Sequence, residues 1–232
     1  MRLALVGYGR MGRAIAALAK TRGHEIALVV DEAENPAGRA LGHERLAGVD
    51  AAFEFTTPAS APANLVRLAE AGVPAVCGTT GWETELPRIS AVFRERRSAL
   101  VHATNFSVGV HLFLRAAREL ARRFAGHADF DAFILEEHHA KKLDAPSGTA
   151  LTLQRLVTGA DPSRRFPITS VRAGAIPGIH TLTYDGAHDT VSLAHTARSR
   201  EGFAAGALRA AEWLPGRLGV FTFEDVLFGE GQ

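Results

Sequence analysis

The chain has 232 residues, enough for one large or two modest domains with a sizeable core. Hydrophobic residues make up 47% and charged residues 22%, the ordinary balance of a soluble globular protein. The net charge of +1 gives no basis for a nucleic-acid or membrane partner, and no apolar stretch approaches the length of a membrane span. Cys77 is the only cysteine, which excludes an intramolecular disulfide and predicts a cytoplasmic protein.

A glycine motif comes first along the chain, directly after an apolar run at residues 3–6. A helical pattern follows it, and a second predicted strand, residues 25–30, ends at Asp31. In this order the glycines permit a tight turn, a close approach to a pyrophosphate and close helix packing, and the acid binds a ribose diol. The pattern predicts a dinucleotide-binding domain of Rossmann type, whose cofactor contacts include Gly7, Tyr8, Gly9, Arg10, Met11, Gly12 and Asp31.

The residues around Asp31 also predict which dinucleotide is preferred. Glu32 and Ala33 follow it, and no lysine or arginine stands beside it. Two carboxylates suit the ribose diol of NADH but repel the 2′-phosphate of NADPH. We expect NADH to be preferred and NADPH to be accepted, with Arg10 or Arg39 as the candidate cation for the phosphate.

Further strand–helix units follow in chain order. Strands are predicted at residues 52–55, 73–77 and 100–103, and helices at 61–71 and about 83–97. Apolar strands that alternate with amphipathic helices indicate a parallel sheet covered on both faces, with ligands bound beyond the C-terminal strand ends. Three loops are therefore expected at one rim with the glycine motif: Thr56-Thr57-Pro58, Gly78-Thr79-Thr80-Gly81 and Asn105-Phe106-Ser107.

In the second half of the chain, several predicted strands follow one another with only a few helices, which indicates an α+β domain with a mixed sheet. Its predicted helices cover residues 108–124 and 148 to about 157, and its predicted strands cover 130–135, 168–172, 180–184 and 190–195. Asp185-Gly186 is expected to form a tight hairpin between the last two strands. A helix through Trp213 and an apolar run at 219–223 then lead back to the first sheet.

The segment from Glu136 to Ala150 carries most of the chemistry: two histidines, two lysines and a Ser-Gly-Thr turn. It joins a strand to a helix N-terminus, where anions are favoured. The segment thus combines a possible proton donor, cationic side chains and helix N–H groups that can bind an anion. This combination predicts a catalytic site for a substrate that carries carboxylates. Neighbouring histidines on a strand point to opposite faces, so at most one easily serves one site. We predict no metal site, because the other histidines are scattered without acidic or cysteine partners at zinc-like spacing.

This segment resembles a known signature. His-His-x-x-Lys-x-Asp-Ala-Pro-Ser-Gly-Thr-Ala is similar to that of the dihydrodipicolinate (4-hydroxy-tetrahydrodipicolinate) reductase family of lysine and diaminopimelate biosynthesis. Phe-Thr-x-Pro, Gly-Thr-Thr-Gly and Asn-Phe-Ser-x-Gly also match the family at these places. The stretch from Asp31 to Asp50 is shorter than in many members, so the chain resembles a compact form. The resemblance implies six further cofactor contacts: Phe55, Thr56, Gly78, Thr80, Ala103 and Phe106.

The resemblance implies NAD(P)H-dependent reduction of 4-hydroxy-tetrahydrodipicolinate, a cyclic dicarboxylate, to tetrahydrodipicolinate. His138 is expected to supply the proton, because histidine titrates near neutral pH. Lys142 is expected to pair with a substrate carboxylate, and the remaining substrate contacts are His139, Gly148 and Thr149. Asp144 and Ser147 are expected to shape the loop as an Asx turn and an N-cap.

The family's layout implies that residues 1–107 and 203–232 form the dinucleotide-binding domain. Residues 108–202 would then bind the substrate and join the subunits of a homotetramer. Two alternatives stay open from the residues alone. An amino-acid dehydrogenase of similar layout would lack Lys142 and the Asp-Ala-Pro-Ser-Gly-Thr loop as a block. A non-enzymatic NADH sensor would carry a basic DNA-reading element, which this chain does not show.

Overall fold

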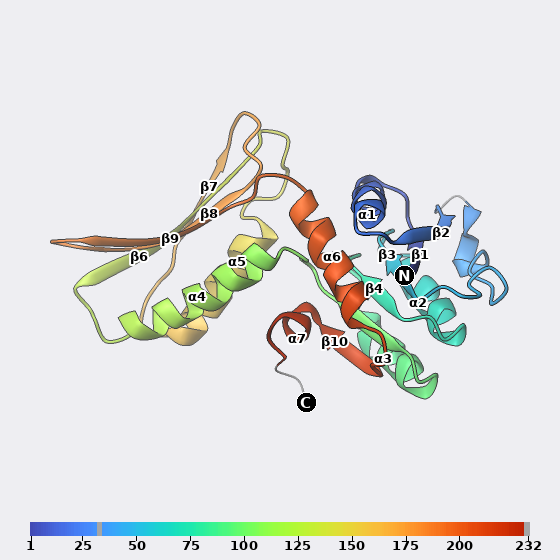
Figure 1. Cartoon of the computed structure of the whole chain (residues 1–232). Helices are drawn as coiled ribbons and strands as arrows, with labels where there is room; N and C mark the ends of the chain where they lie inside the picture. The colour runs from blue at the N-terminus through green and yellow to red at the C-terminus, as the bar shows by residue number, and fades with distance from the viewer. Residues whose placement is uncertain (32–33, 230–232) are drawn as a thin grey trace. The chain divides into compact units, whose positions relative to one another are not determined.

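The computed structural model describes residues 1–31 and 34–229, in two compact units. Unit 1 comprises Met1–Val108 and Arg200–Gln232, and unit 2 comprises Gly109–Ser199 (Figure 1). Glu32 and Ala33, on which the cofactor prediction partly depends, lie outside the described residues. None of the described helices is long and apolar enough to cross a membrane.

Unit 1 is built on a parallel six-stranded sheet. Side chains of its first strand alternate between two apolar clusters, Leu3 and Leu5 in one and Ala4 and Val6 in the other. This alternation is what a sheet covered on both faces requires. Across the sheet the strands run β10 (Gly219–Thr222), β5 (Ala99–His102), β4 (Ala75–Cys77), β3 (Ala51–Glu54), β1 (Arg2–Val6) and β2 (Glu25–Val30).

Helices cover the two faces of this sheet. α1 (Arg10–Thr21) and α6 (Glu201–Trp213) contribute to the cluster that holds Leu3, and α2 (Ala61–Glu70) and α3 (Leu86–Glu95) to the cluster that holds Ala4. Figure 1 shows α1 and α6 on the opposite side of the sheet from α2 and α3. Two 3₁₀ turns, η2 (Pro36–Gly38) and η3 (Glu83–Glu85), and the C-terminal α7 (Phe223–Phe228) complete the unit. The predicted return of the C-terminal segment is confirmed, because β10 pairs with β5.

Unit 2 has a mixed four-stranded sheet, in which β6 (Phe130–His138) pairs parallel with β7 (Ile168–Arg172) and antiparallel with β8 (Ile179–Gly186). α4 (Val108–Phe124) and α5 (Gly148–Ala160) lie together on one face of this sheet (Figure 1). Inward residues of β6 alternate along the strand, so Ala132 and Ile134 pack under the helices. The strand order is β7 (Ile168–Arg172), β6 (Phe130–His138), β8 (Ile179–Gly186) and β9 (Thr190–Thr196).

The structure corrects three local predictions. β6 continues three residues beyond the predicted end at 135, because its polar end still pairs with β7 and β8. Asp185 pairs with Thr190 inside the ladder, so the hairpin turn lies at 187–189 and not at Asp185-Gly186. The helix predicted from 83 begins only at Leu86, because Pro87 favours a helix start at this place.

Candidate active site

The glycine motif forms the turn between β1 and α1. Gly7 has a φ of +93°, and a Cβ there would lie 2.3 Å from the carbonyl oxygen of Phe55. A Cβ on Gly12 would lie 2.3 Å from the carbonyl oxygen of Gly7, which explains why strand and helix pack so closely. Gly9 is the N-cap of α1, and a Cβ there would meet nothing described within 4 Å. The space beside Gly9 at the N-terminus of α1 is therefore open, which fits a pyrophosphate.

The loops after β1, β3 and β4 line one cavity of about 320 Å³. Gly78 is required in its wall, because a Cβ there would lie 2.1 Å from the ring of Phe55. Pro58 and Thr79, which were not among the predicted contacts, also line it. The cavity brings together seven predicted cofactor residues: Gly9, Arg10, Met11, Phe55, Thr56, Gly78 and Thr80.

Four other predicted cofactor residues lie elsewhere on this rim. The backbone N–H of Tyr8 donates to Asp31 Oδ1 at 3.4 Å, so the acid lies beside the glycine turn. Ala103 and Phe106 do not line the cavity. Phe106 is 2% exposed, and its ring packs 6.0 Å from that of Phe55 and 5.0 Å from that of Phe223, centroid to centroid. The Phe106 side chain therefore supports the cavity wall by packing against Phe55 and does not line the cavity itself.

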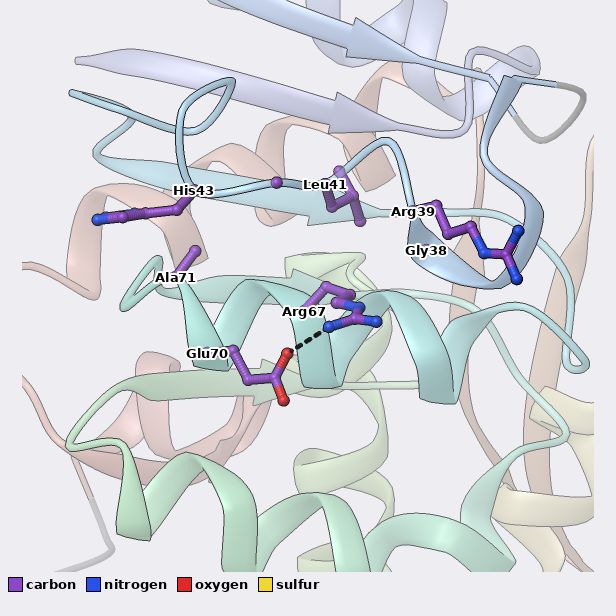
Figure 2. A pocket seen from close by; sticks show the side chains of 8 residues that line it. Gly38, Arg39, Leu41, His43, Arg67, Glu70 and Ala71 are labelled. Atoms are coloured by element: carbon purple, nitrogen blue, oxygen red, sulfur yellow. Dashed lines mark hydrogen bonds and ion pairs between the residues drawn. The ribbon is translucent and has the colours of Figure 1, made fainter.

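The two candidate cations for a 2′-phosphate lie in different cavities. Arg10 lines the cavity of about 320 Å³. Arg39 lines a second one of about 410 Å³, in which Arg67 pairs with Glu70 at 2.9 Å (Figure 2). The two cavities share none of their lining residues. Arg10 is thus the cation that lies with the predicted cofactor residues.

In unit 2, His138 is bound to a carboxylate that the sequence did not single out. Glu136 is fully buried, and its Oε2 bonds to Nδ1 of His138. Its Oε1 accepts a hydrogen bond from Arg172 Nη2 at 2.6 Å, and the same nitrogen donates to the backbone oxygen of Asp144 at 2.6 Å. Arg172 therefore ties the motif loop to the strand that carries His138. The sequence could have identified this carboxylate through the i, i+2 spacing of Glu136 and His138, because that spacing places both side chains on one face of a strand.

These contacts set the charges in the cluster. Burial raises the pKa of Glu136, but hydrogen bonds from Arg172, Ser170 and His138 outweigh it and bring the pKa to about 2. Burial lowers the pKa of His138 below its usual value, and Glu136 only partly opposes this. Burial, with the charge of His138, also lowers the pKa of His180 to about 4. Near neutral pH the cluster thus holds an ionised Glu136 and a His138 that is mostly neutral.

His180 links the cluster to the start of α5. In the β6–β8 ladder His180 lies opposite Glu136. Its ring lies 5.2 Å from that of His138, centroid to centroid. Its Nε2 lies 3.0 Å from Oγ of Ser147, which caps α5 by accepting from the N–H of Ala150 at 3.2 Å. The predicted N-cap role of Ser147 is therefore confirmed.

The other predicted substrate residues lie on the loop and at the helix start. Lys142 Nζ pairs with both carboxylate oxygens of Asp144, at 2.7 and 2.9 Å, and this pairing lowers the pKa of Asp144. Gly148 and Thr149 open α5, and a Cβ on Gly148 would meet nothing described within 4 Å. His139 carries a buried Nδ1 with no hydrogen-bond partner among the described residues. An incoming carboxylate finds an ammonium group and free helix N–H groups here.

Strand pairing brings His180, which the sequence left without an acidic partner at zinc-like spacing, close to Glu136. Ligand atoms of Glu136, His138 and His180 lie within 4.8 Å of one another, close enough to hold a metal ion. The guanidinium of Arg172, however, occupies the second oxygen of Glu136 and places a positive charge at the cluster. This charge opposes a bound cation, and by the same repulsion it also lowers the pKa of His138.

Comparison with known proteins identifies the family. Models described as "Dihydrodipicolinate reductase, N-terminus" and "Dihydrodipicolinate reductase, C-terminus" match residues 1–106 and 109–227. The chain is 37% identical to a 4-hydroxy-tetrahydrodipicolinate reductase of Christiangramia forsetii, over 98% of each chain. It is 35% identical to one of Alkalilimnicola ehrlichii, over 97% of this chain and 98% of the other.

A solved structure has the same fold. It is the dipicolinate-bound dihydrodipicolinate reductase from Paenisporosarcina sp. TG-14, with a TM-score of 0.81 and 22% identity over 96% of this chain and 97% of the other. Fold, glycine turn, histidine cluster and sequence similarity all lead to one assignment. The chain belongs to the dihydrodipicolinate reductase family.

Proposed function

We propose that this protein reduces 4-hydroxy-tetrahydrodipicolinate to tetrahydrodipicolinate with NAD(P)H, in the diaminopimelate route of lysine biosynthesis. The substrate loses water and gains one hydride and one proton, so NAD(P)⁺ and water are the other products. Relatives that match over at least 97% of each chain carry this name. The observation that carries the proposal is the bond between His138 and the buried Glu136, beside Lys142 and the start of α5.

Residues 1–107 and 203–232 would bind the cofactor. The turn at Gly7 and the open N-terminus of α1 fit its pyrophosphate, and the carboxylate of Asp31 fits a ribose diol. The loops that hold Thr56 and Gly78 would border the nicotinamide end. When bound, the cofactor supplies the hydride.

Residues 108–202 would bind the dicarboxylate. One carboxylate would take the free N–H groups and hydroxyl at Gly148 and Thr149, and Lys142 would exchange Asp144 for a substrate carboxylate. His138 would deliver the proton to the carbon next to the one that receives the hydride. Glu136 stabilises the imidazolium form of His138 and orients its ring. Solvent then returns a proton to His138.

Three further properties belong to the same proposal. NADH is the preferred cofactor, since Asp31 suits a ribose diol, with Arg10 as the cation available to NADPH. The protein acts in the cytoplasm, as its single cysteine favours. It assembles as a homotetramer through the sheet of unit 2, in which the outer strands β7 and β9 each have one edge that no other strand of the described residues covers.

A coupled assay tests the reaction. Freshly generated 4-hydroxy-tetrahydrodipicolinate should drive NADH oxidation, whereas aspartate and other amino acids should not drive the reduction of NAD⁺. His138→Gln should lower kcat by about 100-fold or more with little change in KM, because its proton is needed in the transition state. Turnover of an amino acid instead would identify an amino-acid dehydrogenase, and NADH binding without any turnover would identify a sensor.

A further inference from the structure

Unit 1 contains a buried carboxylate that the proposed mechanism does not use. Glu54 is the last residue of β3 and is fully buried. Burial raises its pKa, and several side-chain hydrogen bonds oppose that rise. A buried carboxylate is costly unless it is fully hydrogen-bonded, and an apolar side chain of similar volume avoids that cost. Stability alone therefore gives no reason for an acid at this position.

Four donors converge on Glu54. Oε1 accepts from the hydroxyl of Thr56 and from Asn64 Nδ2 at 3.2 Å. Oε2 accepts from Thr79 Oγ1 at 2.6 Å and from Cys77 Sγ at 3.4 Å. Thr79 Oγ1 in turn accepts from the backbone N–H of Thr56 at 2.8 Å. The carboxylate thus joins the loop after β3 to the loop after β4.

The same network reaches the loop after β2. Asn64, which is 1% exposed, accepts from Asn35 Nδ2 at 2.8 Å. Asn35, which is 6% exposed, accepts from the backbone N–H of Ala40 at 2.9 Å. One buried hydrogen-bond network therefore connects the three loops that follow β2, β3 and β4.

Two members of this network, Thr56 and Thr79, line the cavity of about 320 Å³, and Glu54 lies behind them. We propose that Glu54 is a positioning residue for the dinucleotide: it fixes Thr56 and Thr79 in the cavity wall and, through Asn64, fixes the loop that begins at Asn35. This inference rests on the proposed function only in taking this cavity as the cofactor site.

NADH titration of the free protein tests the proposal without any turnover. Glu54→Gln keeps the shape but turns one acceptor oxygen into a donor, so it cannot satisfy all four donors. Thr79→Val removes the hydroxyl that Glu54 holds, and Thr79→Ser keeps it. We expect Glu54→Gln and Thr79→Val each to weaken NADH binding by about tenfold, and Thr79→Ser to bind like wild type.

The double variant Glu54→Gln, Thr79→Val should bind NADH no more weakly than the single variant with the lower NADH affinity. The reason is that each substitution removes the same link between Glu54 and Thr79. The control is Leu68→Ala, a fully buried residue of α2 in the neighbouring core. It should lower the melting temperature but leave the NADH Kd within about twofold. At saturating NADH, kcat of Glu54→Gln should change less than its KM for NADH.

Two results would overturn the positioning role while leaving cofactor binding intact: wild-type NADH affinity in both Glu54→Gln and Thr79→Val, or an equal loss of affinity in Leu68→Ala. If Glu54→Gln does not fold, the contrast between Thr79→Val and Thr79→Ser decides alone. Failure of the wild-type protein to bind NADH would instead contradict the proposed function.

Discussion

The charge state of His138 is set by single side chains around it. Burial lowers its pKa, and the Glu136 carboxylate pulls that pKa back up. A proton donor with a lowered pKa is charged in only a minority of molecules near neutral pH. Activity that needs the charged ring should therefore increase as the pH falls toward the pKa of His138, and level off below it.

Replacement of Glu136 tests this directly. In Glu136→Gln the amide no longer stabilises the imidazolium, so the acidic rise in kcat should move to lower pH by about one unit. Glu137→Gln is the matched control, because its side chain points to the other face of β6. A pH profile of kcat for the three proteins, with melting temperatures alongside, measures the effect. Identical profiles for wild type and Glu136→Gln would show that Glu136 does not tune the acid.

Asp31 is expected to decide between the two dinucleotides. Its carboxylate lies beside the glycine turn, where it suits a diol and repels a 2′-phosphate. Asp31→Ala should reduce the ratio of kcat/KM for NADH over NADPH by about tenfold. Glu44→Ala, an exposed acid in the same segment, should leave the ratio unchanged. A wild-type preference for NADPH would contradict the argument and assign the phosphate to Arg10.

At the scale of elements, α5 has a stabilised start that can be measured by itself. The Ser147 hydroxyl accepts from the N–H of Ala150 and also contacts His180. Ser147→Ala should lower the free energy of unfolding by about 1 kcal/mol or more, since one cap bond and one buried contact are lost. Thr158→Ala, which removes an exposed hydroxyl from the same helix, should cost nothing. Chemical denaturation of both variants measures the difference, and equal stability would contradict the capping role.

The elements that the sequence predicted well are those with a strong period. The strand at 25–30, the helix at 108–124 and the strand at 168–172 have the predicted bounds, and in the helix apolar residues recur with a clear spacing. The end of β6 was missed because Glu136 and His138 are polar and yet face inward. Polarity alone does not distinguish a buried charge network from a loop.

Within the site, too, some residues could be predicted from the sequence and others could not. The glycine motif is local, so its turn could be predicted from spacing, and the motif around His138 is also contiguous. Arg172 and His180 come to Glu136 only through strand pairing, with β7 on one side and β8 on the other. Contacts between residues so far apart in sequence depend on the register of the sheet, which a single sequence does not specify.

At the scale of the whole molecule, the hydride and the proton would come from different units. Unit 1 would hold the cofactor near Thr56 and Gly78, and unit 2 would hold the dicarboxylate near His138 and Lys142. This division predicts that one hydrogen of the product comes from the cofactor and another from solvent through His138. The origin of each hydrogen can be measured separately.

The most direct test is isotope transfer from the cofactor to the product. The protein would be supplied with 4-hydroxy-tetrahydrodipicolinate and NADH deuterated at both C4 positions, in ordinary water, and the product analysed by mass spectrometry. We expect tetrahydrodipicolinate that carries a single deuterium, formed in step with NADH oxidation. Product without deuterium, or NADH oxidation that leaves the dicarboxylate unchanged, would contradict it.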